Sequence, residues 1–355
     1  MRLLKTVAIN FAVLASLLLI AVIVLEFYVR WEDTKASNVG QRRAATPNYA
    51  GAAWAEQHFR EVDALRTTFF SFVEWRRELF EGETVNVVGP YHERLTPPAD
   101  GAKGGAVFFF GGSTMWGTGA RDQETIPSYY GRIAGRPARN FGESGYVAHQ
   151  SLEMLLWLLQ EGERPDAVVF YEGVNDVMHR CRSGAAAFSQ SQEGRMRALL
   201  AQEPGLFLRV WTLVSVKLAS GQNEDSADRF DCDNDPAKAR RVADALIDDW
   251  KLARLAAESE GIAFFAVLQP VIYFSDTIGD QRADAESEAE GQKRRQFEAV
   301  YPLIRDRLGE VGGIDLTGAL DEQSLFYIDF CHLSPNGNER VAKALAAAIE
   351  PALAE

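Results

Sequence analysis

Residues 106–114 read Ala-Val-Phe-Phe-Phe-Gly-Gly-Ser-Thr. An unbroken apolar run that ends in two glycines predicts a strand buried on both faces, because a half-exposed strand would alternate apolar and polar residues. Such strands belong to parallel sheets that helices cover on both sides. The carboxyl ends of parallel strands are where α/β proteins bind ligands, and glycines there let a substrate approach the backbone closely. Ser113 is therefore predicted to stand at a ligand-binding edge.

The chain after this strand continues as an alternation of strands and helices. Four further strands are predicted, over 138–141, 166–171, 263–268 and 313–316, and helices over 123–134, 151–159, 242–260 and 335–349. This order predicts an α/β domain with a mostly parallel, five-stranded sheet over residues 105–355. Two segments interrupt the alternation: an insertion over 180–235, with a helix candidate at 206–216, and an acidic stretch over 276–292.

The first 104 residues differ in composition from the rest. Val7 to Leu25 is an almost unbroken apolar run of about 19 residues, or roughly 28 Å of helix, which matches the thickness of a bilayer core. Arg2 and Lys5 precede it, so we expect residues 1–30 to be a cytoplasmic tip and transmembrane anchor, with the remainder periplasmic or extracellular. A cleaved signal peptide is the alternative.

Two further segments are expected to join this anchor to the α/β domain. Residues 31–50 are polar and are predicted to be a linker. Apolar residues spaced by three and four within 52–80 predict a helical prelude over 51–104 that packs on the core.

Composition and charge exclude several classes of protein. The chain has 355 residues, 47% of them hydrophobic and 25% charged, which is ordinary for a globular protein. Residues 31–355 contain 34 basic and 49 acidic residues, a net charge of −15, which argues against a nucleic-acid partner. The three cysteines show no metal-ligand spacing; Cys181 and Cys232 either form a disulfide outside the cytoplasm or remain separate thiols.

Chemically useful residues follow the predicted strands. The second strand leads into Asn-Phe-Gly-Glu-Ser-Gly-Tyr over residues 140–146, a segment that can present a backbone N–H to a ligand. The third leads to Asn175, whose side-chain amide can donate to a developing oxyanion. Near the C-terminus, His332 can act as a general base for a serine, since a hydroxyl is a weak nucleophile at neutral pH. Asp329, three residues earlier, can orient the imidazole.

Together these blocks resemble the SGNH (GDSL-like) hydrolase family over roughly residues 105–350. The most specific block is Asp329-Phe-Cys-His332-Leu-Ser-Pro-Asn-Gly337. The resemblance implies a flavodoxin-like, three-layer α/β/α fold. It also implies that Ser113 is the nucleophile, His332 the base and Asp329 its orienting partner. The oxyanion hole would comprise the backbone N–H groups of Ser113 and Gly145 and the side chain of Asn175.

The first block departs from the family pattern. The family usually has Gly-Asp-Ser-Leu, whereas this chain has Gly111-Gly112-Ser113-Thr114. The missing aspartate is not the nucleophile, the base, its orienting partner or an oxyanion donor, so we still expect catalysis. The departure leaves the substrate unidentified.

The sequence thus predicts a membrane-anchored serine esterase that forms an acyl-enzyme. A small-molecule or glycan ester is the expected substrate, and no metal or organic cofactor is implied. One alternative is an O-acetyl esterase or O-acetyltransferase of cell-envelope polysaccharide, which retains the chemistry and changes the acceptor. Another is a non-catalytic scaffold that retains the fold, although a scaffold would need none of these residues.

Overall fold

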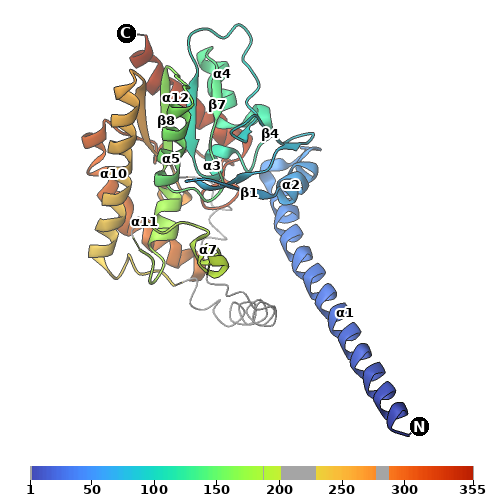
Figure 1. The fold of residues 1–355 in the computed structure, drawn as a ribbon. Helices are drawn as coiled ribbons and strands as arrows, with labels where there is room; N and C mark the ends of the chain where they lie inside the picture. Colours follow the sequence, from blue (N-terminus) through green and yellow to red (C-terminus); the bar gives the residue numbers. More distant parts are fainter. Residues whose placement is uncertain (1, 187, 201–228, 277–287, 355) are drawn as a thin grey trace. The chain divides into compact units, whose positions relative to one another are not determined.

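Figure 1 shows the fold in a computed structural model, which describes residues 2–186, 188–200, 229–276 and 288–354. The chain divides into two compact units, Met1–Ala64 and Leu65–Glu355. The helix expected at 206–216 and most of the acidic stretch at 276–292 lie outside the described residues.

The first unit is helical. It contains α1 (Arg2–Ala44), the short 3-10 helix η1 (Pro47–Tyr49) and α2 (Ala55–Ala64). The prediction of a linker over 31–50 is wrong as far as residue 44, because α1 continues to there. No proline interrupts this polar segment before Pro47, where the helix can no longer continue. None of the helices in the described part of the chain has the length and apolar character needed to cross a membrane.

The predicted helical prelude over 51–104 is also largely wrong. Only α2 is helical there, and the chain then forms five short strands: β1 (Thr67–Phe70), β2 (Glu74–Arg77), β3 (Phe80–Glu81), β4 (Asn86–Val88) and β5 (Glu93–Arg94). The three-and-four spacing of apolar residues continues to Phe72, but the helix ends at Ala64. From Thr67 onward the β-branched and aromatic residues favour strands. β1 and β2 pair as an antiparallel hairpin.

The main sheet has eight strands in the order β10-β9-β8-β6-β7-β5-β4-β3. Its parallel part is formed by β6 (Val107–Gly111), β7 (Ala138–Asn140), β8 (Ala167–Glu172), β9 (Ala263–Leu268) and β10 (Ile314–Asp315). These are the five predicted strands. The expectation of a five-stranded sheet is corrected to an eight-stranded mixed one, because β5, β4 and β3 add an antiparallel extension at the β7 edge.

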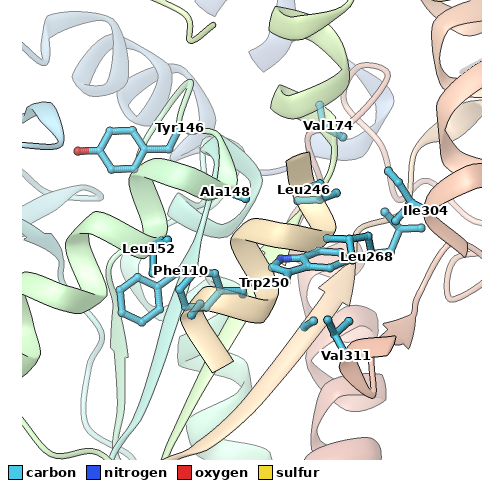
Figure 2. Close-up of a cluster of buried hydrophobic side chains, with 14 of the residues drawn as sticks. Phe110, Tyr146, Ala148, Leu152, Val174, Leu246, Trp250, Leu268, Ile304 and Val311 are labelled. Atoms are coloured by element: carbon cyan, nitrogen blue, oxygen red, sulfur yellow. The ribbon is translucent and has the colours of Figure 1, made fainter. Parts of the chain in front are cut away.

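Helices cover both faces of the parallel part, so the domain has three layers. One face packs on α5 (Ala148–Gln160), α10 (Pro236–Ser259) and α11 (Glu288–Arg305), and the other on α4 (Ile126–Ala134) and α12 (Pro335–Leu353). Within β6, Phe108 and Phe110 join the first cluster while Val107 and Phe109 join the second, which confirms burial on both faces. Figure 2 shows the first cluster around Trp250.

Short elements fill the connections. They are α3 (Ser113–Trp116), η2 (Asp122–Glu124), α6 (Val174–Arg180), α7 (Glu193–Leu200), η3 (Ile272–Phe274) and η6 (Leu308–Val311). Cys181, directly after α6, is joined to Cys232 by a disulfide, so the first of the two alternatives for these cysteines holds. The disulfide joins the two ends of the insertion over 180–235.

Candidate active site

Ser113 is the first residue of α3, directly beyond the end of β6. The two preceding residues, Gly111 and Gly112, are glycines because neighbouring atoms leave no room there for a Cβ atom. A Cβ atom on Gly111 would lie 2.5 Å from the carbonyl oxygen of Tyr171, and one on Gly112 would lie 2.4 Å from Nδ2 of Asn175. Side chains at either position would therefore push the neighbouring strand or Asn175 away from Ser113. The glycine where the family has aspartate thus has a steric reason in this chain.

Ser113, His332 and Asp329 form one hydrogen-bonded chain. Nε2 of His332 lies 2.6 Å from Oγ of Ser113, although the two residues are 219 positions apart. Nδ1 of His332 lies 2.7 Å from Oδ2 of Asp329 and 2.9 Å from Oδ1. With the Nδ1 proton donated to the carboxylate, Nε2 is left as an acceptor for the serine hydroxyl. The structure therefore brings together the three residues that the sequence analysis singled out for nucleophilic chemistry.

Local hydrogen bonds fix the loop that carries His332. Oδ1 of Asp329 accepts the backbone N–H groups of Cys331, at 3.1 Å, and of His332, at 2.8 Å. Thr114, next to Ser113, donates its hydroxyl to the carbonyl of Cys331 at 3.1 Å. The last bond joins α3 directly to the histidine loop, so the nucleophile and the base are held by the same contact.

Asp329, Cys331 and His332 are also the types of residue that bind metals, and their ligand atoms lie within 4.8 Å of one another. Nδ1 of His332 would have to leave Asp329 in order to bind an ion there. The donor set therefore fits the hydrogen-bonded triad better than a metal site.

Asn175 lies in the first turn of α6, beyond the end of β8. Its Nδ2 donates one hydrogen to the carbonyl of Tyr146 at 2.8 Å. An amide nitrogen carries two hydrogens, so the second remains for a substrate oxygen.

Gly145 lies in the loop 141–146, which follows β7. Its backbone has a φ of +81°, and its N–H makes no hydrogen bond with the described residues. The N–H of Gly142, by contrast, donates to Oδ1 of Asn140 at 3.0 Å. Ser113 is the first residue of α3, so its N–H has no acceptor within that helix. Gly145 and Ser113 thus offer the two uncommitted backbone donors that the sequence analysis expected there.

A buried charge network supports α6 from beneath. Asp176 and Arg180, whose side chains have no exposed surface, pair at 3.1 Å, and Arg180 also contacts Asp249 at 3.2 Å. Oδ1 of Asp176 accepts the N–H of Ala148 at 3.2 Å, which ties α6 to the start of α5. Burial raises the pKa of Asp176 and, well above its usual range, that of Glu172. The carboxyl group of Asp176 therefore holds the helix that carries Asn175 against α5.

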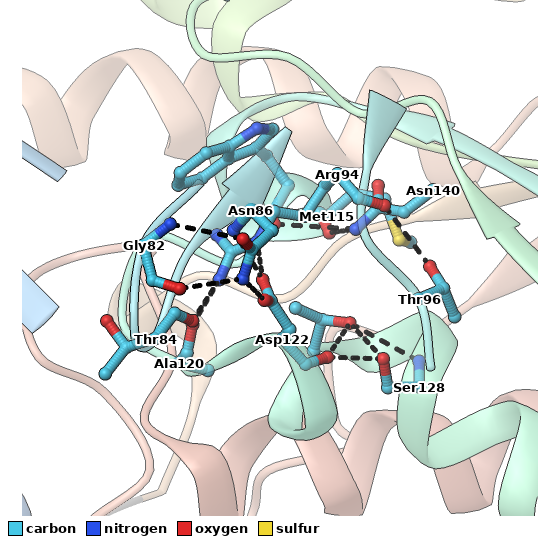
Figure 3. Close-up of polar contacts among 12 residues, drawn as sticks. Gly82, Thr84, Asn86, Arg94, Thr96, Met115, Ala120, Asp122, Ser128 and Asn140 are labelled. Carbon is cyan, nitrogen blue, oxygen red and sulfur yellow. Dashed lines mark hydrogen bonds and ion pairs between the residues drawn. The ribbon is translucent and has the colours of Figure 1, made fainter. Parts of the chain in front are cut away.

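A second buried network lies behind α3. Figure 3 shows Arg94, whose Nε donates to Oδ1 of Asp122 at 2.6 Å, and Asn86, whose Nδ2 donates to Oδ2 of the same carboxylate at 2.7 Å. The guanidinium of Arg94 lies 4.4 Å from the ring centroid of Trp116, the last residue of α3. The antiparallel extension is therefore joined to the helix that begins with Ser113.

The buried arginines of these networks and the contacts of β2 with the loop 141–146 were not predicted from the sequence. Buried arginines are uncommon, and without the fold an arginine in a polar segment is indistinguishable from a surface residue. The pattern Glu74-Trp-Arg-Arg77 does alternate in part, but it is too short to predict a strand.

No family model and no curated protein matches the sequence. Several solved structures of other proteins are similar to this structure. A carbohydrate acetylesterase family member from Sinorhizobium meliloti is 16% identical, with 71% of this chain and 100% of that chain covered and a TM-score of 0.41. A putative lipolytic protein of the G-D-S-L family from Desulfitobacterium hafniense is 11% identical, with 69% and 100% covered and a TM-score of 0.37. The acetyl xylan esterase AlAXEase is 18% identical, with 69% and 99% covered and a TM-score of 0.36.

Proposed function

We propose that the protein is a serine ester hydrolase of the SGNH type that works through an acyl-enzyme. The observation that carries this proposal is the continuous hydrogen-bonded chain from Asp329 through His332 to Ser113. A serine hydroxyl becomes a useful nucleophile when a neutral imidazole accepts its proton, and an imidazole does so when a carboxylate holds the correct tautomer.

In the first half of the reaction, Oγ of Ser113 attacks the ester carbonyl and its proton passes to Nε2 of His332. The carbonyl oxygen becomes an oxyanion, which accepts hydrogen bonds from the backbone N–H groups of Ser113 and Gly145 and from Nδ2 of Asn175. The tetrahedral intermediate collapses as His332 returns the proton to the leaving alcohol. The acyl group is then an ester of Ser113.

The second half repeats these steps with water as the nucleophile. His332 takes a proton from water, the resulting hydroxide attacks the acyl carbonyl, and the same three donors stabilise the second oxyanion. The carboxylic acid leaves, and the proton returns to Oγ of Ser113. Every proton transfer uses one histidine, so this chemistry needs no metal or organic cofactor.

The substrate class we propose is a small-molecule or glycan ester. The negative charge of the domain is a reason to expect an uncharged acyl group and to expect no nucleic-acid partner. A panel of short acyl esters and acetylated polysaccharides, assayed for released acid and for transfer to an added acceptor, distinguishes hydrolysis from acyl transfer.

We further propose that the apolar run Val7–Leu25 anchors the protein, with its N-terminus in the cytoplasm and its catalytic domain outside. Two features support this localisation: the purely basic flank before the run, and the Cys181–Cys232 disulfide, a bond typical of oxidising compartments. Protease treatment of intact spheroplasts should degrade the catalytic domain. Protection of that domain from the protease would contradict the proposed orientation.

The direct test of the proposed reaction is a Ser113→Ala variant assayed on short acyl esters. Hydrolysis should fall by about 10⁴-fold or more, since the nucleophile is lost. Ser259→Ala, at an exposed hydroxyl that bonds only to the carbonyl of Ala256, is the matched control and should retain wild-type turnover. Turnover by Ser113→Ala near the wild-type rate would refute the assignment.

A further inference from the structure

We propose that β2, a strand outside the parallel core, positions the loop 141–146 for oxyanion stabilisation, and that Arg77 is the positioning residue at its centre. This inference rests on the proposed function, because it assigns a role in the same reaction. It extends the active site to a segment that precedes the α/β alternation in the chain.

The first contacts come from Arg76, whose side chain is completely buried. Its Nη1 donates to the carbonyl of Phe141 at 2.9 Å, and its Nε and Nη2 donate to the carbonyls of Tyr91, at 3.2 Å, and His92, at 3.1 Å. A single guanidinium thus joins the start of the loop to the segment between β4 and β5.

Arg77 contacts the middle of the loop through both its backbone and its side chain. Its backbone N–H donates to Oε2 of the buried Glu143 at 2.8 Å, and its Nη2 donates to the hydroxyl of Ser144 at 2.9 Å. Its Nε lies 3.5 Å from Oε1 of Glu143. Arg77 also lies near the helix that begins with Ser113, because its guanidinium is 5.5 Å from the ring centroid of Trp116 in α3.

Trp75 contacts the end of the loop. Its indole N–H donates to the carbonyl of Ser144 at 3.4 Å, its ring meets that of Tyr146 edge-on at 5.2 Å, and its carbonyl accepts the Tyr146 hydroxyl. The carbonyl of Tyr146 in turn holds Nδ2 of Asn175. Contacts from β2 therefore reach both the backbone donor and the side-chain donor of the proposed oxyanion hole.

These contacts bracket Gly145. Ser144 before it and Tyr146 after it are both held by β2, while Glu143 is fixed to the core because its N–H donates to the carbonyl of Gly111 at 2.9 Å. Catalytic donors have to lie within about 0.5 Å of their productive positions. A glycine has no side chain to fix it, so its neighbours must set the direction of its N–H.

The guanidinium of Arg77 is dispensable for the hairpin itself. β1 and β2 pair through their backbones, with Thr67 opposite Arg77. Loss of the side chain should therefore release the hydroxyl of Ser144 and the 3.5 Å contact with Oε1 of Glu143. The bond from the backbone N–H of Arg77 to Glu143 and the pairing of the strand should remain.

The test is an Arg77→Met variant in the full-length protein, assayed on a short acyl ester. We expect kcat to fall about tenfold while KM changes less than about twofold, because the donors act on the transition state and not on the bound ester. The rate of Ser113 labelling by a fluorophosphonate should fall by a similar factor, since its phosphoryl oxygen uses the same donors.

Arg136→Met is the matched control. Arg136 has a similar side-chain exposure, 15% against 17% for Arg77, and it pairs with Glu350 and Asp166 at the opposite ends of the strands. It should lower the melting temperature and leave kcat unchanged. Equal kcat values for the two variants would overturn the positioning role.

A second variant, Ser144→Ala, covers the case in which Arg77→Met fails to fold. It removes only the hydroxyl that Arg77 holds, so kcat should fall about threefold with an unchanged KM; no change in kcat would overturn the role. If the Ser113→Ala variant turned over the ester at the wild-type rate, the proposed function would be overturned, and this role with it. Ser113-dependent turnover that is insensitive to both variants would overturn only the role of β2.

Discussion

The two parts of the main sheet are built by different means. In the parallel part, β6 and β8 are buried along their whole length, and each is followed by a short helix that carries a residue of the proposed site, Ser113 in α3 or Asn175 in α6. In the antiparallel part, β3, β4 and β5 have two or three residues each and are held by a buried ion pair between Arg94 and Asp122. Hydrophobic burial forms the first part and polar contacts form the second. We therefore expect substitutions at the ends of the parallel strands to change rate, and substitutions in the antiparallel part to change stability.

The largest effect is expected for His332→Ala. Among the residues that the structure describes, His332 is the base that contacts Ser113, so its removal should lower kcat by about 10⁴-fold or more. His332 is partly exposed and contributes little to the core, so the melting temperature should stay within a few degrees of wild type. Steady-state kinetics and a thermal melt together test this, and a residual rate above 1% of wild type would count against the histidine as the base.

The next largest effect tests the antiparallel part. Arg94→Met leaves the carboxylate of Asp122 buried without its charge partner, which should cost about 3–5 kcal/mol of unfolding free energy. Turnover per folded molecule should change little, because Arg94 contacts no proposed catalytic group.

Chemical denaturation measures this loss of stability. A large fall in kcat with unchanged stability would remove the distinction between the two parts of the sheet.

A smaller effect is expected for Asn175→Ala, which returns to the parallel part. Loss of one oxyanion donor should lower kcat by about 10²-fold and leave KM nearly unchanged. Stability should fall only slightly, since the side chain makes a single hydrogen bond, to Tyr146. Val174→Ala, the preceding residue in α6, is the control: it should lower stability and spare kcat. A kcat for Asn175→Ala within threefold of wild type would exclude Asn175 from the oxyanion hole.

The smallest expected effect is a dependence of stability on pH, which comes from His149 in the charge network that supports α6. The hydrogen bond with Asp249, at 2.8 Å, raises the pKa of His149, which burial opposes. A histidine whose pKa is raised on folding stabilises the protein below its unfolded pKa of about 6.5, and this contribution is lost as the pH rises through the folded value. NMR titration should place the pKa of His149 above 6.5, and His149→Gln should remove the loss of stability that accompanies deprotonation of this histidine as the pH rises above that value. A pKa at or below 6.5 would contradict this.

The same contrast explains how much was predictable from sequence. All five parallel strands and four of their covering helices follow from apolar runs such as Val107–Phe110, whereas α11 was not predicted, because its first residues continue an acidic, polar stretch. The triad and oxyanion residues were noticed because each lies after a strand or before α12, and their roles were assigned from the resemblance to the SGNH hydrolases. The strands β1 to β5 were missed because segments of two to four residues carry no period. Arg76, Arg77 and Arg94 were missed because their burial depends on contacts with residues far along the chain.

The central claim is that Ser113 is the nucleophile of a working triad. The most direct measurement is covalent labelling of the full-length protein with a fluorophosphonate, followed by peptide mass spectrometry and an ester assay on the same sample. We predict one adduct, on Ser113, with ester hydrolysis lost in proportion to labelling and no adduct formed in His332→Ala. An adduct on another residue, or hydrolysis that persists after complete labelling of Ser113, would contradict the claim.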